Sequence, residues 1–177
     1  EEGCRVTRIK NLIHNLIPQK FFGDIFIHNK EFSKKILSQY LTSVIKNLKV
    51  LGFNINTVPV LDILYKKSHD IIGDRSFSHK TKIIKELGNL YLKTYNKNRF
   101  GTVMKHIPGH GLSLTDSHKR LPIIKKNLSY LIKNDFSCFK QKQTFFAMTG
   151  HLLFSKIDRN NCVSHSKKII KEIIREK

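Results

Sequence analysis

The feature that most constrains the fold is a repeated alternation of helical and strand-like patterns along the chain. In the predicted helices, apolar side chains recur at three- and four-residue spacing and form one face. The predicted strands are short apolar stretches, as expected of buried strands in a parallel sheet. We expect helices at residues 31–50, 80–97, 126–135 and 166–176, strands at 55–61, 101–106 and 144–149, and a short helix at Ile9–Ile17.

Strand, loop, helix and strand again is the order of parallel βα units. The strands begin about 45 residues apart, which is generous for a doubly wound sheet and ordinary for a (β/α)8 barrel with large loops. A closed barrel needs roughly 250 residues, whereas this chain has 177. The fold class expected is therefore α/β. Residues 1–177 should form the central βα units of a single TIM-type (β/α)8 domain, truncated at both ends.

The charge of the chain is strongly basic, with 33 Lys and Arg, 13 Asp and Glu and a formal net charge of +20. Most of the cations are lysines spread along the whole chain, whereas surfaces that read bases favour arginine. Ile, Asn and Phe are also abundant, as in proteins encoded by AT-rich genomes. We therefore expect no nucleic-acid partner, although a basic module that binds nucleic acid or another polyanion stays open as an alternative.

The cysteine content and the hydropathy pattern bear on location. Cys4, Cys138 and Cys162 are widely spaced and form no CxxC, which favours free thiols in a reducing, cytoplasmic compartment over disulfides or a metal site. No apolar run approaches the roughly 18–20 residues that span a bilayer, so no membrane partner is expected.

Polar side chains collect directly after the predicted strands, where a (β/α)8 barrel carries its functional groups. Three histidines and an aspartate lie within thirteen residues of one loop and invite a metal site. Pro108 and Gly109, however, prevent His106 and His110 from sharing a helical face, so we expect no metal. The residues concerned are Asp62, Asp74, Arg75, Lys105, His106, His110, Asp116, His118 and His151.

Acid–base chemistry is the better interpretation of the loop after the second clear strand. Asp116 and His118 are two residues apart and can reach each other in a bent loop. A carboxylate that accepts a hydrogen bond from one ring nitrogen raises the basicity of the imidazole, and the other nitrogen can then transfer protons near neutral pH. Spacing alone leaves a structural role for this pair open.

The stretch KHIPGHGLSLTDSHKRLP at 105–122 resembles the signature of bacterial family-3 glycoside hydrolases of the β-N-acetylglucosaminidase type, which act in peptidoglycan recycling. Ile107 stands at the position that is aromatic in that signature. The opening EEGCRVTR also resembles a family motif, with Glu1 and Cys4 as departures. Further similar segments are FNINTVPVLDI at 53–63, IIGDRSFS at 71–78 and MTGHLLFSKID at 148–158, so the resemblance spans almost the whole chain in order.

The resemblance implies a single catalytic domain and a retaining hydrolase that removes terminal β-linked N-acetylglucosamine (GlcNAc) from GlcNAc-anhydro-MurNAc muropeptides. It implies His118 as general acid/base supported by Asp116, with no cofactor and a monomeric protein in the cytoplasm. The family's nucleophile is an Asp in an Asp-Asp loop, and no adjacent aspartates occur in this sequence. The residues implied to hold the sugar are Arg8, Arg75, Lys105 and His106.

Three further expectations follow. We expect structural roles for Asp62, Asp74, His110 and His151, and we assign none to Asp158. Because the nucleophile is missing, the 177-residue piece by itself should be inactive. An inactive remnant of such a hydrolase stays open as a further alternative.

Overall fold

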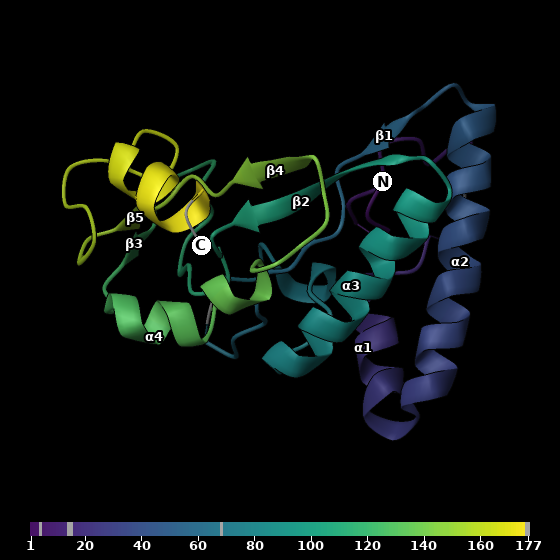
Figure 1. Cartoon of the computed structure of the whole chain (residues 1–177), viewed down its shortest axis with the longest axis horizontal. Coiled ribbons are helices and arrows are strands. Elements are labelled where there is room, and N and C mark those ends of the chain that lie inside the picture. Colours follow the sequence, from purple (N-terminus) through teal and green to yellow (C-terminus); the bar gives the residue numbers. More distant parts are fainter. Residues whose placement is uncertain (4, 14–15, 68, 176–177) are drawn as a thin grey trace.

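The computed structural model describes residues 1–3, 5–13, 16–67 and 69–175. Its helices and strands alternate along most of the chain, as the sequence predicts (Figure 1). The elements are α1 (Gln19–His28), α2 (Lys30–Val50), β1 (Ile55–Asn56), the 3-10 turn η1 (Gly73–Arg75), α3 (Thr81–Lys97), β2 (Gly101–Ile107), β3 (Ile123–Ile124), α4 (Leu128–Lys133), the 3-10 turn η2 (Phe136–Cys138), β4 (Phe146–Thr149), β5 (Leu153–Phe154) and the π-helix η3 (Ile169–Arg175).

The main sheet has three parallel strands in the order β1-β2-β4. Ile55 lies opposite Gly101, and Val103 lies opposite Phe146. The strands of this sheet thus follow one another in chain order, as in a (β/α)8 barrel, apart from β3, which lies between β2 and β4 in the sequence and pairs elsewhere. The strands of the described part do not close. The architecture is an open part of a TIM-type barrel. A second parallel pair, β3 with β5, lies beside it.

The outer edge of β4 is exposed. Within the described residues β4 pairs with β2 alone, so its other side carries free backbone groups. Phe145 is 92% exposed, and Phe146 and Met148 are exposed beside it. An apolar strand with an open edge is a template for pairing with another strand.

Three helices cover one side of the sheet, with α2 outermost and in contact with both α1 and α3 (Figure 1). Asn29 begins α2, because its side chain accepts a hydrogen bond of 3.0 Å from the backbone N–H of Phe32. Tyr40 of α2 holds the segment before α1 through two hydrogen bonds with the backbone of Ile17. The core side chains of α2 and α3 include Leu37, Leu41, Val44, Ile45, Leu48, Ile83, Ile84, Leu87, Tyr91 and Tyr95.

A second, smaller core lies at the other end of the molecule. It joins α4, β3, β5 and the start of η3 through Ile124, Leu131, Phe154 and Ile169. The ring of Phe136 packs edge-on against Phe154, with the ring centres 5.3 Å apart. None of the helices described is long and apolar enough to cross a bilayer.

The expected helices at 31–50 and 80–97 and the strands at 101–106 and 144–149 are confirmed within a few residues. The helix expected at 126–135 is shorter. The helix expected at 166–176 is present from residue 167, is wound as a π-helix over Ile169–Arg175, and has its expected end outside the described residues. The strand expected at 55–61 is reduced to β1 and a bridge between Val60 and Lys105, because Pro59 offers no N–H for continuous pairing.

The short helix expected at Ile9–Ile17 is wrong. Ile9 accepts backbone hydrogen bonds from Leu12 and Ile13, which form turns, and residues 14–15 lie outside the described part. The helix of this region is α1, which starts after Pro18. Proline suits the start of a helix because its missing N–H would have no helical partner there.

Helix α1 approaches the chain at Phe77 so closely that only glycine fits at position 23. A Cβ on Gly23 would lie 1.7 Å from the backbone oxygen of Phe77. In a helix interior alanine is more favourable than glycine by about 1 kcal/mol. Gly23→Ala should nevertheless lower the free energy of unfolding by about 3 kcal/mol or more, because the backbone at Phe77 must move. Chemical denaturation measures this change.

Gly88→Ala in α3 is the matched control. Its Cβ would meet the end of the Leu61 side chain, which can shift. We expect a clearly smaller loss of stability than for Gly23→Ala. Equal stability of Gly23→Ala and the unsubstituted protein would show that α1 does not pack in this way.

Candidate active site

Three charged side chains meet at the carboxyl end of the sheet, with a histidine next to one of them in the sequence. Lys105 and His106 lie at the end of β2, and Arg75 ends the turn η1 in the loop after β1. Glu2 reaches them from the first segment of the chain. This is the edge at which barrel proteins of this class carry their functional groups. Of the residues predicted to hold a ligand, Arg75 and Lys105 are brought together by Glu2, and His106 follows Lys105 in β2.

Glu2 is the centre of this group. Its carboxylate accepts hydrogen bonds from Nε of Arg75 at 2.6 Å and from Nη2 of Arg75 at 2.9 Å. The ammonium of Lys105 forms an ion pair with the same carboxylate. Glu2 and Lys105 are 6% and 5% exposed. A buried carboxylate therefore holds two cations side by side, leaving one net positive charge.

The ionisation of this cluster follows from burial and pairing. Burial raises the pKa of Glu2, but the hydrogen bond from Arg75 and the charge of Lys105 outweigh it and leave the pKa below its usual value. Burial lowers the pKa of Lys105, and the Glu2 carboxylate opposes that effect. Buried charges persist only with such partners. The cluster therefore presents N–H donors suited to hydroxyl oxygens.

Asp62 holds the ring of His106 at the end of β2 and the backbone of His110 in the loop that follows. It is 1% exposed, and its Oδ2 lies 2.6 Å from Nδ1 of His106. Its Oδ1 accepts a hydrogen bond of 2.7 Å from the backbone N–H of His110. Burial raises the pKa of Asp62, but His106 and the backbone of His110 outweigh it and lower the pKa. These contacts support the structural role expected of Asp62 and fix the ring of His106.

Asp116 and His118 are in contact in the loop, but the contact is made by the backbone of His118 and not by its imidazole ring. Oδ1 of Asp116 accepts a hydrogen bond of 2.9 Å from the backbone N–H of His118. That contact lowers the pKa of Asp116. Among the described residues, no hydrogen bond joins the carboxylate to the His118 ring, which is exposed. The catalytic roles of this pair stay predictions.

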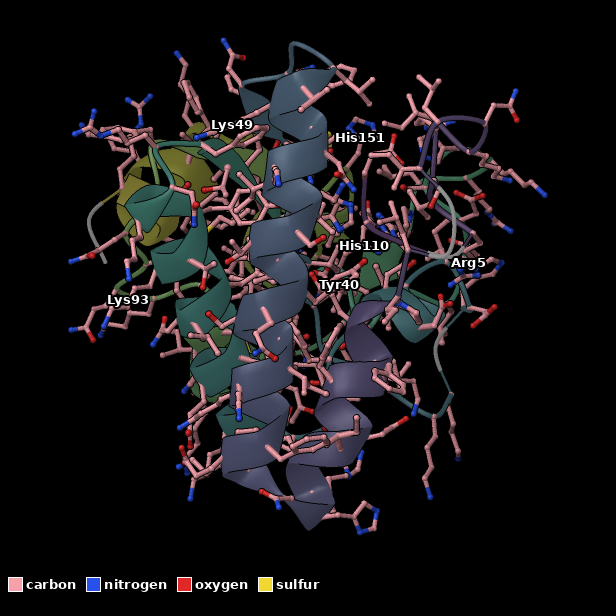
Figure 2. The ribbon with its side chains drawn as sticks, turned by 90° about the vertical axis from the view of Figure 1, so that its right-hand side faces the viewer. Arg5, Tyr40, Lys49, Lys93, His110 and His151 are labelled. Atoms are coloured by element: carbon pink, nitrogen blue, oxygen red, sulfur yellow. The ribbon has the colours of Figure 1, made fainter. Side chains whose placement is uncertain are left out.

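The other predicted residues differ in their surroundings. Arg8 is exposed, and its backbone N–H donates to the carboxylate of Glu1. Asp74 pairs with Nε of Arg5 at 2.9 Å, which supports its structural role. His110 is buried, and burial lowers the pKa of its ring. Figure 2 shows Arg5 at the rim of the molecule and His110 further inside.

Glu2 is the site residue that sequence reasoning missed. It lies in the segment EEGCRVTR, which was assigned to the site only through Arg8. The available signal was the excess of cations, because Arg75 and Lys105 cannot share a buried space without an anion. Within the described residues, no group of three or more His, Cys, Asp or Glu side chains is arranged to hold a metal ion.

Loss of the Glu2 charge should destabilise the protein. Glu2→Gln keeps the shape but leaves Arg75 and Lys105 without an anion. Breaking a buried ion pair from one side costs about 3–5 kcal/mol, and we expect a loss of that order in chemical denaturation. The control is Glu31→Gln, whose carboxylate forms an exposed pair with Lys34 at 3.5 Å and should change little. Equal effects of the two substitutions would contradict the central role of Glu2.

Asp135 should make stability depend on pH. It is buried beneath Gly109, and Tyr65 donates a hydrogen bond of 2.9 Å to its carboxylate. Burial raises the pKa of Asp135 to about 6, above the value of about 3.9 in an unfolded chain. The folded state thus favours the protonated form. The contribution of protonated Asp135 to the stability of the fold is complete below about pH 4 and is lost as the pH rises through about 6.

Asp135→Asn should remove that loss, because an amide does not ionise in this pH range. Its oxygen can still accept the Tyr65 hydrogen bond. The gain relative to the unsubstituted protein should be about 3 kcal/mol larger at pH 8 than at pH 4. Denaturation at both pH values measures it. Asp24→Asn, which removes an exposed pair with Lys20, should show no comparable difference. A constant gain across the pH range would exclude a raised pKa.

The chain is similar to known proteins in sequence and in fold. The β-hexosaminidases of Nitrosomonas eutropha and Methylobacillus flagellatus are 29% and 26% identical to this chain. Each match covers 99% of this chain and 51% of the relative. The crystal structure of NagZ from Neisseria gonorrhoeae in complex with N-trifluoroacetyl-D-glucosamine superposes with a TM-score of 0.91 at 25% identity, over 99% of this chain and 51% of that one.

The chain thus spans about half the length of the curated relatives that it matches. The sequence profile described as "Glycosyl hydrolase family 3 N terminal domain" matches residues 1–177, which is every residue of the sequence. The parallel strands of the described part are consistent with this match. The chain belongs to the glycosyl hydrolase family 3 N-terminal domain family.

Proposed function

We propose that this chain is part of a single catalytic domain of a retaining β-N-acetylglucosaminidase. The observation that carries the proposal is the buried group of Glu2, Arg75 and Lys105 at the carboxyl ends of the strands. Its net positive charge and its N–H donors suit a sugar ring, whose hydroxyl groups offer oxygen acceptors. His106 stands next to Lys105 and is oriented by Asp62. Arg8 is proposed as a further sugar ligand.

His118 is proposed as the general acid/base. It would protonate the leaving oxygen while an aspartate attacks the anomeric carbon, and it would then take a proton from the water that releases the sugar. Asp116 is proposed to support its ring. Because the two now meet through the backbone of His118, this role requires the loop to rearrange when substrate binds. The nucleophilic aspartate is proposed to lie outside residues 1–177.

The substrate proposed is the terminal non-reducing GlcNAc of GlcNAc-anhydro-MurNAc muropeptides. The relatives named β-hexosaminidase and the N-acylated glucosamine in the related NagZ structure support an N-acetylated amino sugar. We further propose a monomeric protein located in the cytoplasm. The basic charge is carried by dispersed lysines such as Lys93, which projects outward from α3 (Figure 2). This dispersion does not support a separate nucleic-acid site.

Substitution of His118 in the full-length protein tests the mechanism. His118→Ala should lower kcat for an aryl β-GlcNAc substrate about 10²- to 10⁴-fold, as removal of a general acid/base does. The thermal unfolding temperature should stay unchanged, because the side chain is exposed. His28→Ala, an exposed histidine at the end of α1, is the matched control and should keep full activity. Normal turnover by His118→Ala would remove His118 from the mechanism.

A further inference from the structure

We propose that Cys162 is a reactive thiol, activated by His165, Ser164 and His151, and that it is a site of covalent modification by peroxides and other small soft electrophiles. The proposal concerns a second cluster, beyond the end of β4, which uses none of the proposed sugar-binding or catalytic residues. It therefore stands independently of the proposed glycosidase activity.

Three polar atoms surround the sulfur of Cys162. Nδ1 of His165 lies 3.1 Å from Sγ, Oγ of Ser164 lies at 3.3 Å, and Nδ1 of His151 lies at 3.7 Å. Ser164 also contacts both imidazoles, at 2.9 Å from Nδ1 of His151 and 3.4 Å from Nδ1 of His165. A thiol in direct contact with an imidazole nitrogen that can take its proton is the basic arrangement of an activated nucleophile.

The backbone holds this cluster in place. Val163 donates a hydrogen bond of 2.9 Å to the carbonyl of Leu152, which joins the turn at 162–165 to the residue after His151. His165 and Ser166 both donate to the carbonyl of Cys162, which closes the turn. Figure 2 labels His151 of this cluster, which lies on the same side of α2 as His110. The approach of both histidines to the sulfur is thus built into the fold.

Cys138 provides a contrast within the same chain. It is 0% exposed, and burial raises the pKa of its thiol to about 12, so it should be inert. Cys162 retains 9% exposure beneath two exposed imidazoles. Burial raises the pKa of Cys162 as well, but the hydrogen bonds with His165 and Ser164 outweigh burial and leave the pKa below its usual value.

The chemistry is that of a thiolate and an imidazolium. The proton of Cys162 passes to Nδ1 of His165, and the thiolate attacks one oxygen of hydrogen peroxide. The S–O bond forms as the O–O bond breaks, and the departing hydroxide takes the proton from His165 and leaves as water. The sulfur is oxidised to a sulfenic acid while the peroxide is reduced. Metal binding is not proposed, because no described group of side chains is arranged to hold an ion.

Alkylation kinetics on the folded full-length protein test the proposal. Iodoacetamide is added at pH 7, and the modified fraction of each cysteine peptide is followed by mass spectrometry, which separates Cys162 from Cys138 and Cys4. Cys162 should react at least tenfold faster than Cys138. His165→Phe and His165→Gln should each slow the labelling of Cys162 about tenfold without changing the unfolding temperature, because His165 is exposed.

A second measurement uses hydrogen peroxide followed by a sulfenic-acid trap. The adduct should form on Cys162 and fall in both His165 variants, whereas the exposed control His28→Phe should leave it unchanged. Equal labelling rates of Cys162 in the unsubstituted protein and in His165→Gln would overturn the proposal. So would labelling of Cys162 as slow as that of Cys138.

Discussion

The ion-paired carboxylate of Glu2 is the interaction on which the site depends. Arg75 and Lys105 come from a turn and a strand that are 30 positions apart in the sequence, and both are drawn inward against a cost of desolvation. The Coulomb attraction of one buried anion offsets that cost and takes the place of the stabilisation that water gives to exposed cations. Glu2 therefore fastens the first segment of the chain to the carboxyl end of the sheet and sets the positions of the cations.

The fold could be predicted where a pattern is repeated over many residues. The apolar faces of α2 and α3 extend over several turns, and burial of those faces decides their structure. The pattern is weak in the strands β3 and β5, which have two residues each and are held by neighbouring backbone. It misleads at Ile9–Ile17, where Leu12 is exposed although apolar and α1 begins only after Pro18.

The site could be predicted where its residues are contiguous in a recognisable motif. Lys105 and His106 are adjacent, and their setting at the end of β2 follows from the strand pattern. Glu2 was missed because its partners are 73 and 103 positions away, and no local pattern reveals an ion pair of that span. The surroundings of Cys162 were missed for the same reason, since His151 reaches it from another loop.

The buried cluster and the exposed loop are subject to different kinds of natural selection. A descendant that lost its chemistry would still need Glu2, Arg75 and Lys105 to remain folded, so purifying selection for stability alone would preserve them. His118 is exposed and contributes little to stability. Neutral drift would erase it first. As the proposed general acid/base, the exposed histidine would therefore be a more informative trace of a working lineage than the buried charges.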